Sequence, residues 1–267
     1  MFKKKSPVEK EWQLFLKREE KLLSKYGKAK TSLLEQKLKG VVPEGLQDKL
    51  EQAFYKAFQV ILAKGTGIIE KTYSKEKLEQ AYKIREYSHE LRASRKSLKA
   101  SAKTAGIQTA KNVAGAGIEG AALGLLGIGL PDIPLFLAVI FRSMYTLCLH
   151  YGIDYSKAQE QEMLLELIAM SLYRGTDFAE YDAKLNQRLY EMNAAQNESF
   201  ACSDAIAKEA MRRAAKSLSG ELLYLKFLQG IPIAGVIGGL YDGIYLKRIT
   251  DYAAVKMERR YLLSKMR

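Results

Sequence analysis

The sequence predicts an all-α fold, a single multi-helix bundle built around a central apolar, glycine-rich helical hairpin. Through most of the 267 residues, apolar side chains recur at steps of three and four, the period of an amphipathic helix. Alternating β-branched runs, typical of strands, are almost absent, and the chain contains only five prolines. The hydrophobic content of 48% is ordinary for a folded globular protein.

Two helices are expected in the N-terminal quarter of the chain. Residues 9–39 carry a helical apolar pattern with charges in the gaps, and Gly40 ends it. Residues 44–64 resume the pattern on one apolar face. Gly65 and Gly67 are expected to break this second helix, because glycine is a poor helix former.

Residues 75–104 form a basic amphipathic helix in this interpretation. Its cationic side chains fall on one narrow stripe: Arg85, Arg92, Arg95, Lys96, Lys99 and Lys103. Its apolar side chains fall on another face: Ile84, Tyr87, Leu91, Leu98 and Ala102. This pattern suits binding to an anionic membrane surface, and it equally suits a core-packed helix with a solvated charged face. Both interpretations remain open at the level of sequence.

Small residues recur every four positions in two apolar segments. They occur between residues 106 and 124, and again at Gly235, Gly239 and Gly243. A helix tolerates such glycines where a second backbone comes close, since a row without side chains forms a groove. We therefore expect helices around 106–130 and 233–249 to pack tightly, against each other or against another neighbour.

The apolar stretch 124–141 contains two prolines and an aspartate, which argue against one straight helix. Pro131 and Pro134 each lack a backbone donor and clash with a preceding helical turn. The sequence predicts a helix end near Leu130, with Asp132 capping a second helix that runs from about residue 133 to 151. Pro134 then lies in a first turn, where its missing N–H costs little.

The two apolar helices on either side of this break are expected to form a hairpin. Glu119 and Arg142 are isolated charges on its opposite arms, so we expect them to form an ion pair. Neither arm provides the uninterrupted 20 or so apolar residues that a membrane-spanning helix needs. The hairpin either enters one leaflet of a membrane or forms the core of a soluble bundle.

The rest of the chain returns to ordinary helical patterns. Helices are expected over residues 160–173, 177–196 and 202–228, and over a basic closing segment from Asp251. Pro232 is expected to open the helix that precedes this closing segment. No linker divides the chain, so residues 1–267 are interpreted as one domain, with 1–44 as a peripheral charged helix.

Net charge and the reactive residues limit the possible chemistry. The formal net charge of +13 favours acidic partners, although solubility alone can explain it. The pair Cys148 and Cys202 fits a reducing compartment, and the basic N-terminus is not followed by an apolar signal segment. His89 and His150 have no metal-ligand spacing, and no phosphate-binding loop occurs, so neither a metal nor a cofactor is predicted.

Three carboxylates in apolar surroundings are weak candidates for acid–base catalysis: Asp132, Glu119 and Asp242. Each also has a structural interpretation, as a helix cap, an ion-pair partner or a local polar contact. No nucleic-acid-binding motif is recognisable, and the basic residues lie beside apolar segments, which suits lipid headgroups better than a duplex.

Two segments resemble the EcsC family of bacterial proteins. They are GAALGLLGIGLPDIPLFLAVIFRSMYTLCLHYGIDY at 120–155 and GIPIAGVIGGLYDGIY at 230–245, within a likeness that covers about residues 45–267. The resemblance implies a mostly helical protein associated with Ecs-type ABC transporter genes. It implies no catalytic residues.

These observations lead to one expected function and one alternative. We expect a cytoplasmic, non-enzymatic accessory protein, peripheral at the inner face of the cell membrane and near ABC transporter subunits. In this interpretation the basic residues of segment 75–104 bind the anionic surface. The alternative is a soluble hydrolase-type enzyme that uses an apolar-pocket carboxylate such as Asp132. The oligomeric state is not predicted.

Overall fold

The computed structural model describes residues 5–26, 45–92, 94–98, 132–173, 177–194, 204–228 and 240–266. These stretches contain no strand, which confirms the all-α prediction. Their helices are α1 (Pro7–Tyr26), α3 (Leu46–Val60), α4 (Thr66–Glu70), α5 (Lys75–Leu91), α7 (Asp132–His150), α8 (Ala158–Leu172), α9 (Phe178–Ala194), α10 (Asp204–Leu228) and α11 (Leu240–Ser264).

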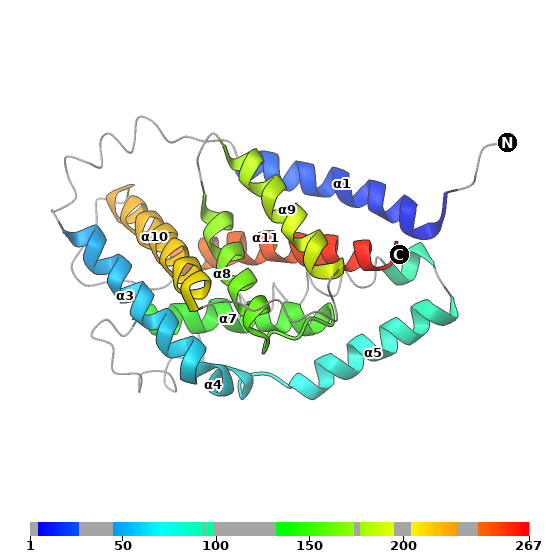
Figure 1. Cartoon of the computed structure of the whole chain (residues 1–267), viewed down its shortest axis with the longest axis horizontal. Helices are drawn as coiled ribbons and strands as arrows, with labels where there is room; N and C mark the ends of the chain where they lie inside the picture. Colours follow the sequence, from blue (N-terminus) through cyan, green and yellow to red (C-terminus); the bar gives the residue numbers. More distant parts are fainter. Residues whose placement is uncertain are drawn as a thin grey trace.

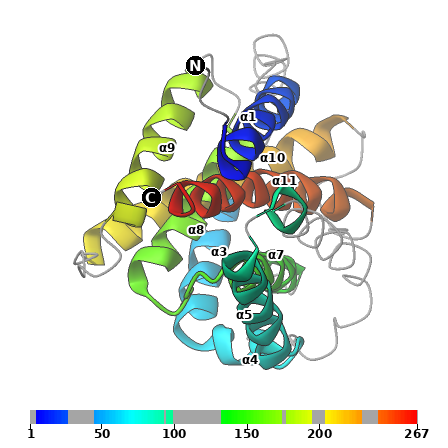
Figure 2. The same ribbon diagram turned by 90° about the vertical axis from the view of Figure 1, so that its right-hand side faces the viewer.

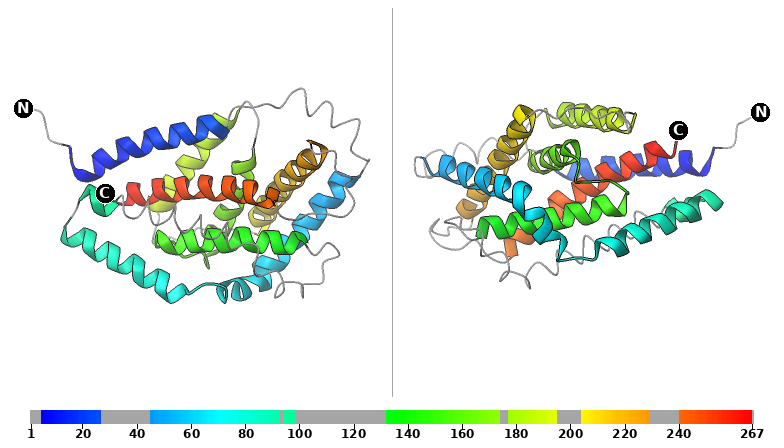
Figure 3. Two further views of the ribbon diagram at one scale, coloured as in Figure 1. Left: turned by 180° about the vertical axis from the view of Figure 1, so that it is seen from behind. Right: turned by 60° about the horizontal axis from the view of Figure 1, so that its bottom comes forward.

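Helix α7 forms the centre of the bundle. It packs against α3, α5 and α11, and α8 packs against α10 and α11. Figure 1 shows α7 and α11 running through the middle of the molecule, with α5 at the periphery. In Figure 2, α11 lies between α1 on one side and α7 on the other. The rear view in Figure 3 shows α3 and α10 side by side at one end.

The helix predicted after the proline-rich corner is present. Helix α7 is described from Asp132 to His150, close to the expected bounds of 133 and 151, and Pro134 is its third described residue. The residues before Asp132 lie outside the described part of the chain, so the predicted break at the corner stays a prediction. The helix ends in a turn at Gly152, whose φ of 70° is left-handed.

Helix α7 is also the one span of the described chain that is long and apolar enough to cross a membrane. Residues Ile133–His150 have a mean hydropathy of 1.6, and 78% of this window is buried inside the protein. The same pattern is typical of the core helix of a bundle. Within the described chain α7 packs as such a core helix.

Gly65 and Gly67 do not break the second helix, contrary to the prediction. The chain continues from α3 through a π-helical turn at Ile61–Gly65 directly into α4. Both Ile61 and Ile69 are fully buried on this segment. Their burial outweighs the cost of about 1 kcal/mol that each glycine adds to a helix.

The basic segment is not one helix over 75–104. Helix α5 ends at Leu91, because Arg92 adopts an extended backbone with φ −147° and ψ 85°. A new helical turn follows, and the Ser94 hydroxyl accepts a hydrogen bond from the Ser97 amide at 3.2 Å. Ser94 therefore acts as an N-cap, which favours a helix start at this point over a continuous helix.

The C-terminal segments form one helix rather than two. Helix α11 runs without interruption from Leu240 to Ser264, so the expected closing helix from Asp251 is its second half. After Gly243 this stretch contains no glycine or proline that could stop it. The predictions for α8, α9 and α10 are confirmed, with bounds that shift by a few residues.

Several predictions fall outside the described residues. The first hairpin arm with Glu119, the corner residue Pro131, and the packing of Gly235 and Gly239 all belong to this group. Lys99, Lys103 and Cys202 also lie outside it. The proposed pairing of the two glycine-rich helices and the Glu119–Arg142 ion pair therefore stay predictions.

Candidate functional site

Three apolar side chains on one side of α5 are exposed to solvent. Ile84, Tyr87 and Leu91 retain 66%, 62% and 70% of their accessible surface. Their spacing of three and four residues places them on one face of the helix. This arrangement differs from a core-packed helix, in which these same side chains would be the buried ones.

The opposite side of α5 holds the helix on the protein. The Arg85 guanidinium donates a hydrogen bond of 2.7 Å to the His150 carbonyl at the end of α7. The Tyr261 hydroxyl of α11 donates to Glu86 at 2.8 Å, and Lys265 pairs with the same carboxylate. These contacts fix the orientation of α5, so its apolar residues face outward.

The predicted cationic stripe is divided by the fold. Arg92 and Lys96 are exposed on the segment that follows α5, whereas Arg85 is partly buried against α7. The Nε atom of Arg95 lies 3.5 Å from the buried Glu11 carboxylate of α1. Lys99 and Lys103 are outside the described part of the chain.

Lys83 adds an exposed cation on the other flank of the apolar residues, which the sequence analysis did not select. We call the combination of Ile84, Tyr87 and Leu91 with Lys83, Arg92 and Lys96 the α5 face. One exposed carboxylate, Glu90, lies in the same stretch. The exposed charges from residue 83 to 92, together with Lys96, sum to +2: three cations and one anion.

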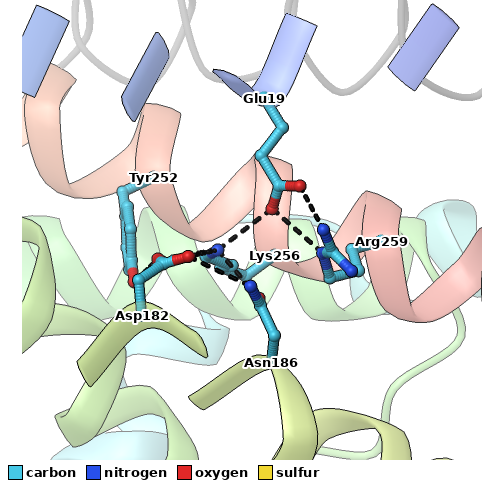
Figure 4. A network of polar contacts seen from close by, with 6 residues as sticks. All are labelled: Glu19, Asp182, Asn186, Tyr252, Lys256 and Arg259. Carbon is cyan, nitrogen blue, oxygen red and sulfur yellow. Dashed lines mark hydrogen bonds and ion pairs between the residues drawn. The ribbon is translucent and has the colours of Figure 1, made fainter. Parts of the chain in front are cut away.

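A second candidate site is the ion network beneath α1, drawn in Figure 4. Lys256 of α11 is 0% exposed, and its Nζ atom donates to Asp182 and Asn186 of α9, each at 2.8 Å. It also donates to Glu19 of α1 at 3.0 Å. The Tyr252 hydroxyl completes the network with a 2.7 Å bond to Asp182.

Arg259 binds the same Glu19 carboxylate through two of its nitrogens. Its Nε atom donates to Oε1 at 3.0 Å, and its Nη2 atom contacts Oε2. Burial alone would raise the pKa of Glu19, but the bonds and charges of Arg259 and Lys256 outweigh it and lower the pKa. Glu19 is therefore ionised at neutral pH.

A third polar cluster lies where α4 meets the turn after α7. The Tyr155 hydroxyl donates to Glu70 at 2.5 Å and lies 2.8 Å from the Tyr73 hydroxyl, and Lys75 pairs with Glu70. The Tyr155 ring stacks on Tyr145 with centroids 4.1 Å apart. Burial, then the bond to Glu70, raises the pKa of Tyr155, so the phenol stays protonated.

The side chains of the three candidate carboxylates lie outside what the structure describes, so their catalytic role stays a prediction. Asp132 is the first residue of α7 and Asp242 lies in the first turn of α11, while Glu119 is outside the described residues. Gly243 follows Asp242 within α11. Arg142, the expected partner of Glu119, donates to the Thr72 carbonyl at 3.0 Å.

The remaining reactive side chains are packed into the protein. Burial, followed by the charge of Glu160, raises the pKa of the Cys148 thiol, so the thiol carries no nucleophilic thiolate. Across the described stretches no three His, Cys, Asp or Glu side chains group as metal ligands. His150 is buried at the end of α7, with its carbonyl bound by Arg85.

Comparison with known proteins identifies the family of the chain. No curated protein and no solved structure matches the chain. The sequence profile described as the EcsC protein family matches residues 8–262 of the 267-residue chain, a range that includes α1 as well as the helices from residue 45 onward. The chain therefore belongs to the EcsC protein family.

Proposed function

We propose that the protein binds the anionic inner surface of the cell membrane peripherally, through the α5 face, as a non-enzymatic accessory protein. The observation that carries the proposal is the outward exposure of Ile84, Tyr87 and Leu91, with the exposed cations Arg92 and Lys96 on the segment that follows α5. Exposed apolar side chains flanked by cations are the combination with which an amphipathic helix lies in the headgroup layer. Isolated exposed apolar residues are common, but three on one helical face form a patch.

The energies of the α5 face suit reversible attachment. Full burial of one large apolar side chain contributes about 1.5–3 kcal/mol, and partial insertion contributes less. Each cation close to an anionic leaflet contributes about 1 kcal/mol, which salt reduces. The expected binding is therefore weak, dependent on anionic lipid, and sensitive to ionic strength.

Vesicle co-sedimentation tests this proposal. The full chain is mixed with vesicles of phosphatidylcholine alone, or with vesicles containing one third phosphatidylglycerol. We expect binding to the anionic vesicles, and we expect Ile84→Gln/Leu91→Gln to reduce it at least about tenfold, given 1.4 kcal/mol per tenfold and two lost apolar contacts. Arg92→Gln/Lys96→Gln should weaken binding and flatten its salt dependence.

Matched controls come from α9 and α10, which do not carry the α5 face. Tyr190→Gln/Ile206→Gln removes two large hydrophobic side chains that are also exposed, and Lys208→Gln/Lys216→Gln removes two exposed cations of α10. Both pairs should leave vesicle binding unchanged. Glu90→Lys should strengthen binding, since it replaces the exposed carboxylate of the α5 face. Equal loss with the α5 and control variants would overturn the proposal.

The resemblance of the sequence to the EcsC family extends the proposal to the neighbourhood of an Ecs-type ABC transporter. A photo-crosslinking side chain in place of Lys83 would test this extension in cells, since Lys83 borders the apolar residues without being one of them. Crosslinks to a transporter subunit, absent when the same group replaces Lys216, are the expected result. Crosslinks to lipid alone would limit the proposal to the membrane surface.

A further inference from the structure

The buried face of α1 is unusual because two of its three almost completely buried residues are carboxylates, beside the apolar contacts of Val8, Trp12 and Leu23. Glu11, Phe15 and Glu19 are almost completely buried and lie at spacings of four on one face of the helix. A docked amphipathic helix normally buries an apolar stripe and keeps carboxylates exposed. Helix α1 is therefore attached to α11 and the turn at 95–98 by ion pairs as well as by apolar contacts.

The receiving side has the geometry of an oxyanion-binding site. Arg259 approaches Glu19 with two nitrogens, and the Lys256 ammonium donates to the same carboxylate at 3.0 Å. A forked guanidinium together with an ammonium binds carboxylate or phosphate oxygens equally well. The Glu19 side chain occupies this site in the present structure, as Figure 4 shows.

The site is held in place by parts of the chain other than α1. Asp182 and Asn186 of α9 each bind Lys256 Nζ at 2.8 Å, and Tyr252 orients Asp182. These contacts do not involve Glu19, so the ammonium keeps its position without α1. Loss of Glu19 would leave Arg259 and Lys256 facing the single carboxylate of Asp182.

The other charged contacts of α1 are less complete. Arg95 Nε and Glu11 Oε2 are both buried, 3.5 Å apart, and neither makes a hydrogen bond. In one further ion pair α1 supplies the cation, because Arg18 of α1 pairs with Glu258 of α11 at 2.5 Å. Glu11, Glu19 and Arg18 together bring a net charge of −1 to the interface with α11. An external anion can supply the same charge.

We propose that Lys256 and Arg259 form a binding site for a phosphate group, and that Glu19 of α1 fills this site as a built-in competitor. A phosphate ligand then displaces α1 from α11. The phosphate belongs either to a lipid headgroup or to a small soluble molecule. The inference does not depend on the α5 face, and its first test contains no membrane.

The chain carries its own reporter for the docking of α1. Trp12 is the single tryptophan of the sequence, and its ring stacks on Phe15 with centroids 5.4 Å apart. The Arg259 guanidinium lies 5.1 Å from the Trp12 ring centre. Release of α1 removes the Arg259 contact, whereas Phe15 moves with the helix. The Trp12 ring then loses its cover from α11, so acrylamide quenching of Trp12 fluorescence measures how much α1 is undocked.

The first experiment titrates the full chain with inorganic phosphate and, at equal ionic strength, with sodium chloride. We expect phosphate to increase Trp12 quenching to a plateau, with a much smaller and unsaturable effect of chloride. Glu19→Gln should show high quenching before any phosphate is added, because a hydrogen-bonded charge is worth about 1.5–3 kcal/mol and its loss releases α1. Glu20→Gln, the same change on the exposed side of α1, should behave as wild type.

A second measurement tests whether Arg259 is part of the phosphate-binding site. Phosphate binding to Glu19→Gln and to Glu19→Gln/Arg259→Gln is compared by calorimetry, because α1 is released in both and only the proposed site differs. Binding should be lost in the double variant. Should wild-type quenching respond to phosphate no more than to chloride, the proposal fails, and this holds even if the variants do not fold.

Vesicles then distinguish the two sources of phosphate. The Ile84→Gln/Leu91→Gln variant is used, so that the α5 face does not contribute. If Glu19→Gln in this background increases sedimentation with phosphatidylglycerol vesicles, a lipid phosphate occupies the site. If sedimentation is unchanged while inorganic phosphate still displaces α1, the ligand is a soluble phosphate.

Discussion

Lys256 of α11 and Asp182 of α9 form an ion pair in the interior of the protein, with Nζ 2.7 Å from Oδ1. The lysine is 0% exposed and the aspartate is almost completely buried. Two charges removed from water are tolerated because Asn186, Tyr252 and Glu19 supply further hydrogen bonds. The pair joins helices 74 residues apart in sequence and fixes how α9 lies against α11.

Removal of the lysine alone should therefore be costly. Lys256→Met leaves Asp182 buried without its partner, and we expect a loss of about 3–5 kcal/mol in the free energy of unfolding. Urea denaturation monitored by circular dichroism measures it. Lys247→Met is the control, since Lys247 forms an exposed pair with Asp251 and its loss should cost at most about 1 kcal/mol. Similar losses in the two variants would show that the buried network adds no stability.

Gly152 has a left-handed backbone and a close neighbouring side chain, whereas Gly45 has only the left-handed backbone. The φ of Gly152 is 70°, and a Cβ atom there would collide with the Tyr82 ring of α5. Gly45 has a similar φ of 73°, but a Cβ atom there would meet no neighbour within 4 Å. We expect Gly45→Ala to cost about 1–2 kcal/mol from backbone strain alone, and Gly152→Ala to cost about 1–3 kcal/mol more.

A double variant tests the cause of the extra cost at Gly152. Tyr82→Ala removes the ring that a new Cβ atom would meet, so Gly152→Ala should be milder in that background. Thermal unfolding of the four chains of the cycle supplies the coupling energy. A coupling of zero would mean that the clash is relieved by movement of the ring and that strain explains the whole effect.

The Tyr155 hydroxyl gives a third prediction. Tyr155→Phe keeps the stacking on Tyr145 but loses the bonds to Glu70 and Tyr73. We expect a loss of about 1–3 kcal/mol, because the charged Glu70 partner makes this bond stronger than a neutral one. Tyr155→Leu should lose a further ~0.5–1.5 kcal/mol of aromatic contact. Chemical denaturation of both variants measures the two losses, and a Tyr155→Phe variant as stable as the wild type would show that the hydroxyl group contributes nothing.

Local features of the sequence predicted the helix that follows the proline-rich corner. Asp132 and Pro134 stand within one turn of chain, so a cap and a proline near a helix start favour α7 without tertiary information. The break at Arg92 has a local cause as well. The Ser94 hydroxyl caps the turn at 95–98, and this N-cap signal was present in the sequence but was not used.

The buried network was beyond sequence reasoning because its members are distant in the chain. Glu19 and Lys256 are 237 positions apart, and either residue taken alone reads as an ordinary solvated charge on an amphipathic helix. The α5 face shows a second limit of reasoning from sequence. Periodicity identified Ile84, Tyr87 and Leu91 as one face, but only the packing of Arg85 and Glu86 decides that this face points outward.

Acid should release α1 from α11. Burial raises the pKa of Glu19, yet Arg259 and Lys256 lower it by more, so the folded value lies below the ordinary 4.5. A carboxylate with a lowered pKa stabilises the docked state fully above pH 4.5, and this contribution is lost as the pH falls through the folded value. We expect acrylamide quenching of Trp12 to increase as the pH falls below 4.5.

One neighbouring group acts in the opposite sense but over a different pH range. Burial raises the pKa of Glu258, and its partner Arg18 offsets this only in part, so Glu258 takes up its proton above pH 4.5. The protonation of Glu258 favours the folded state as the pH falls toward 4.5, and it cannot produce release below that value.

Glu19→Gln removes the titrating group next to Lys256 and Arg259, so its quenching should already be high at pH 7 and should lack the acid transition. Glu20→Gln should keep the wild-type transition, because Glu20 is exposed on the other side of α1. An acid transition that persists unchanged in Glu19→Gln would assign the release to a group other than Glu19.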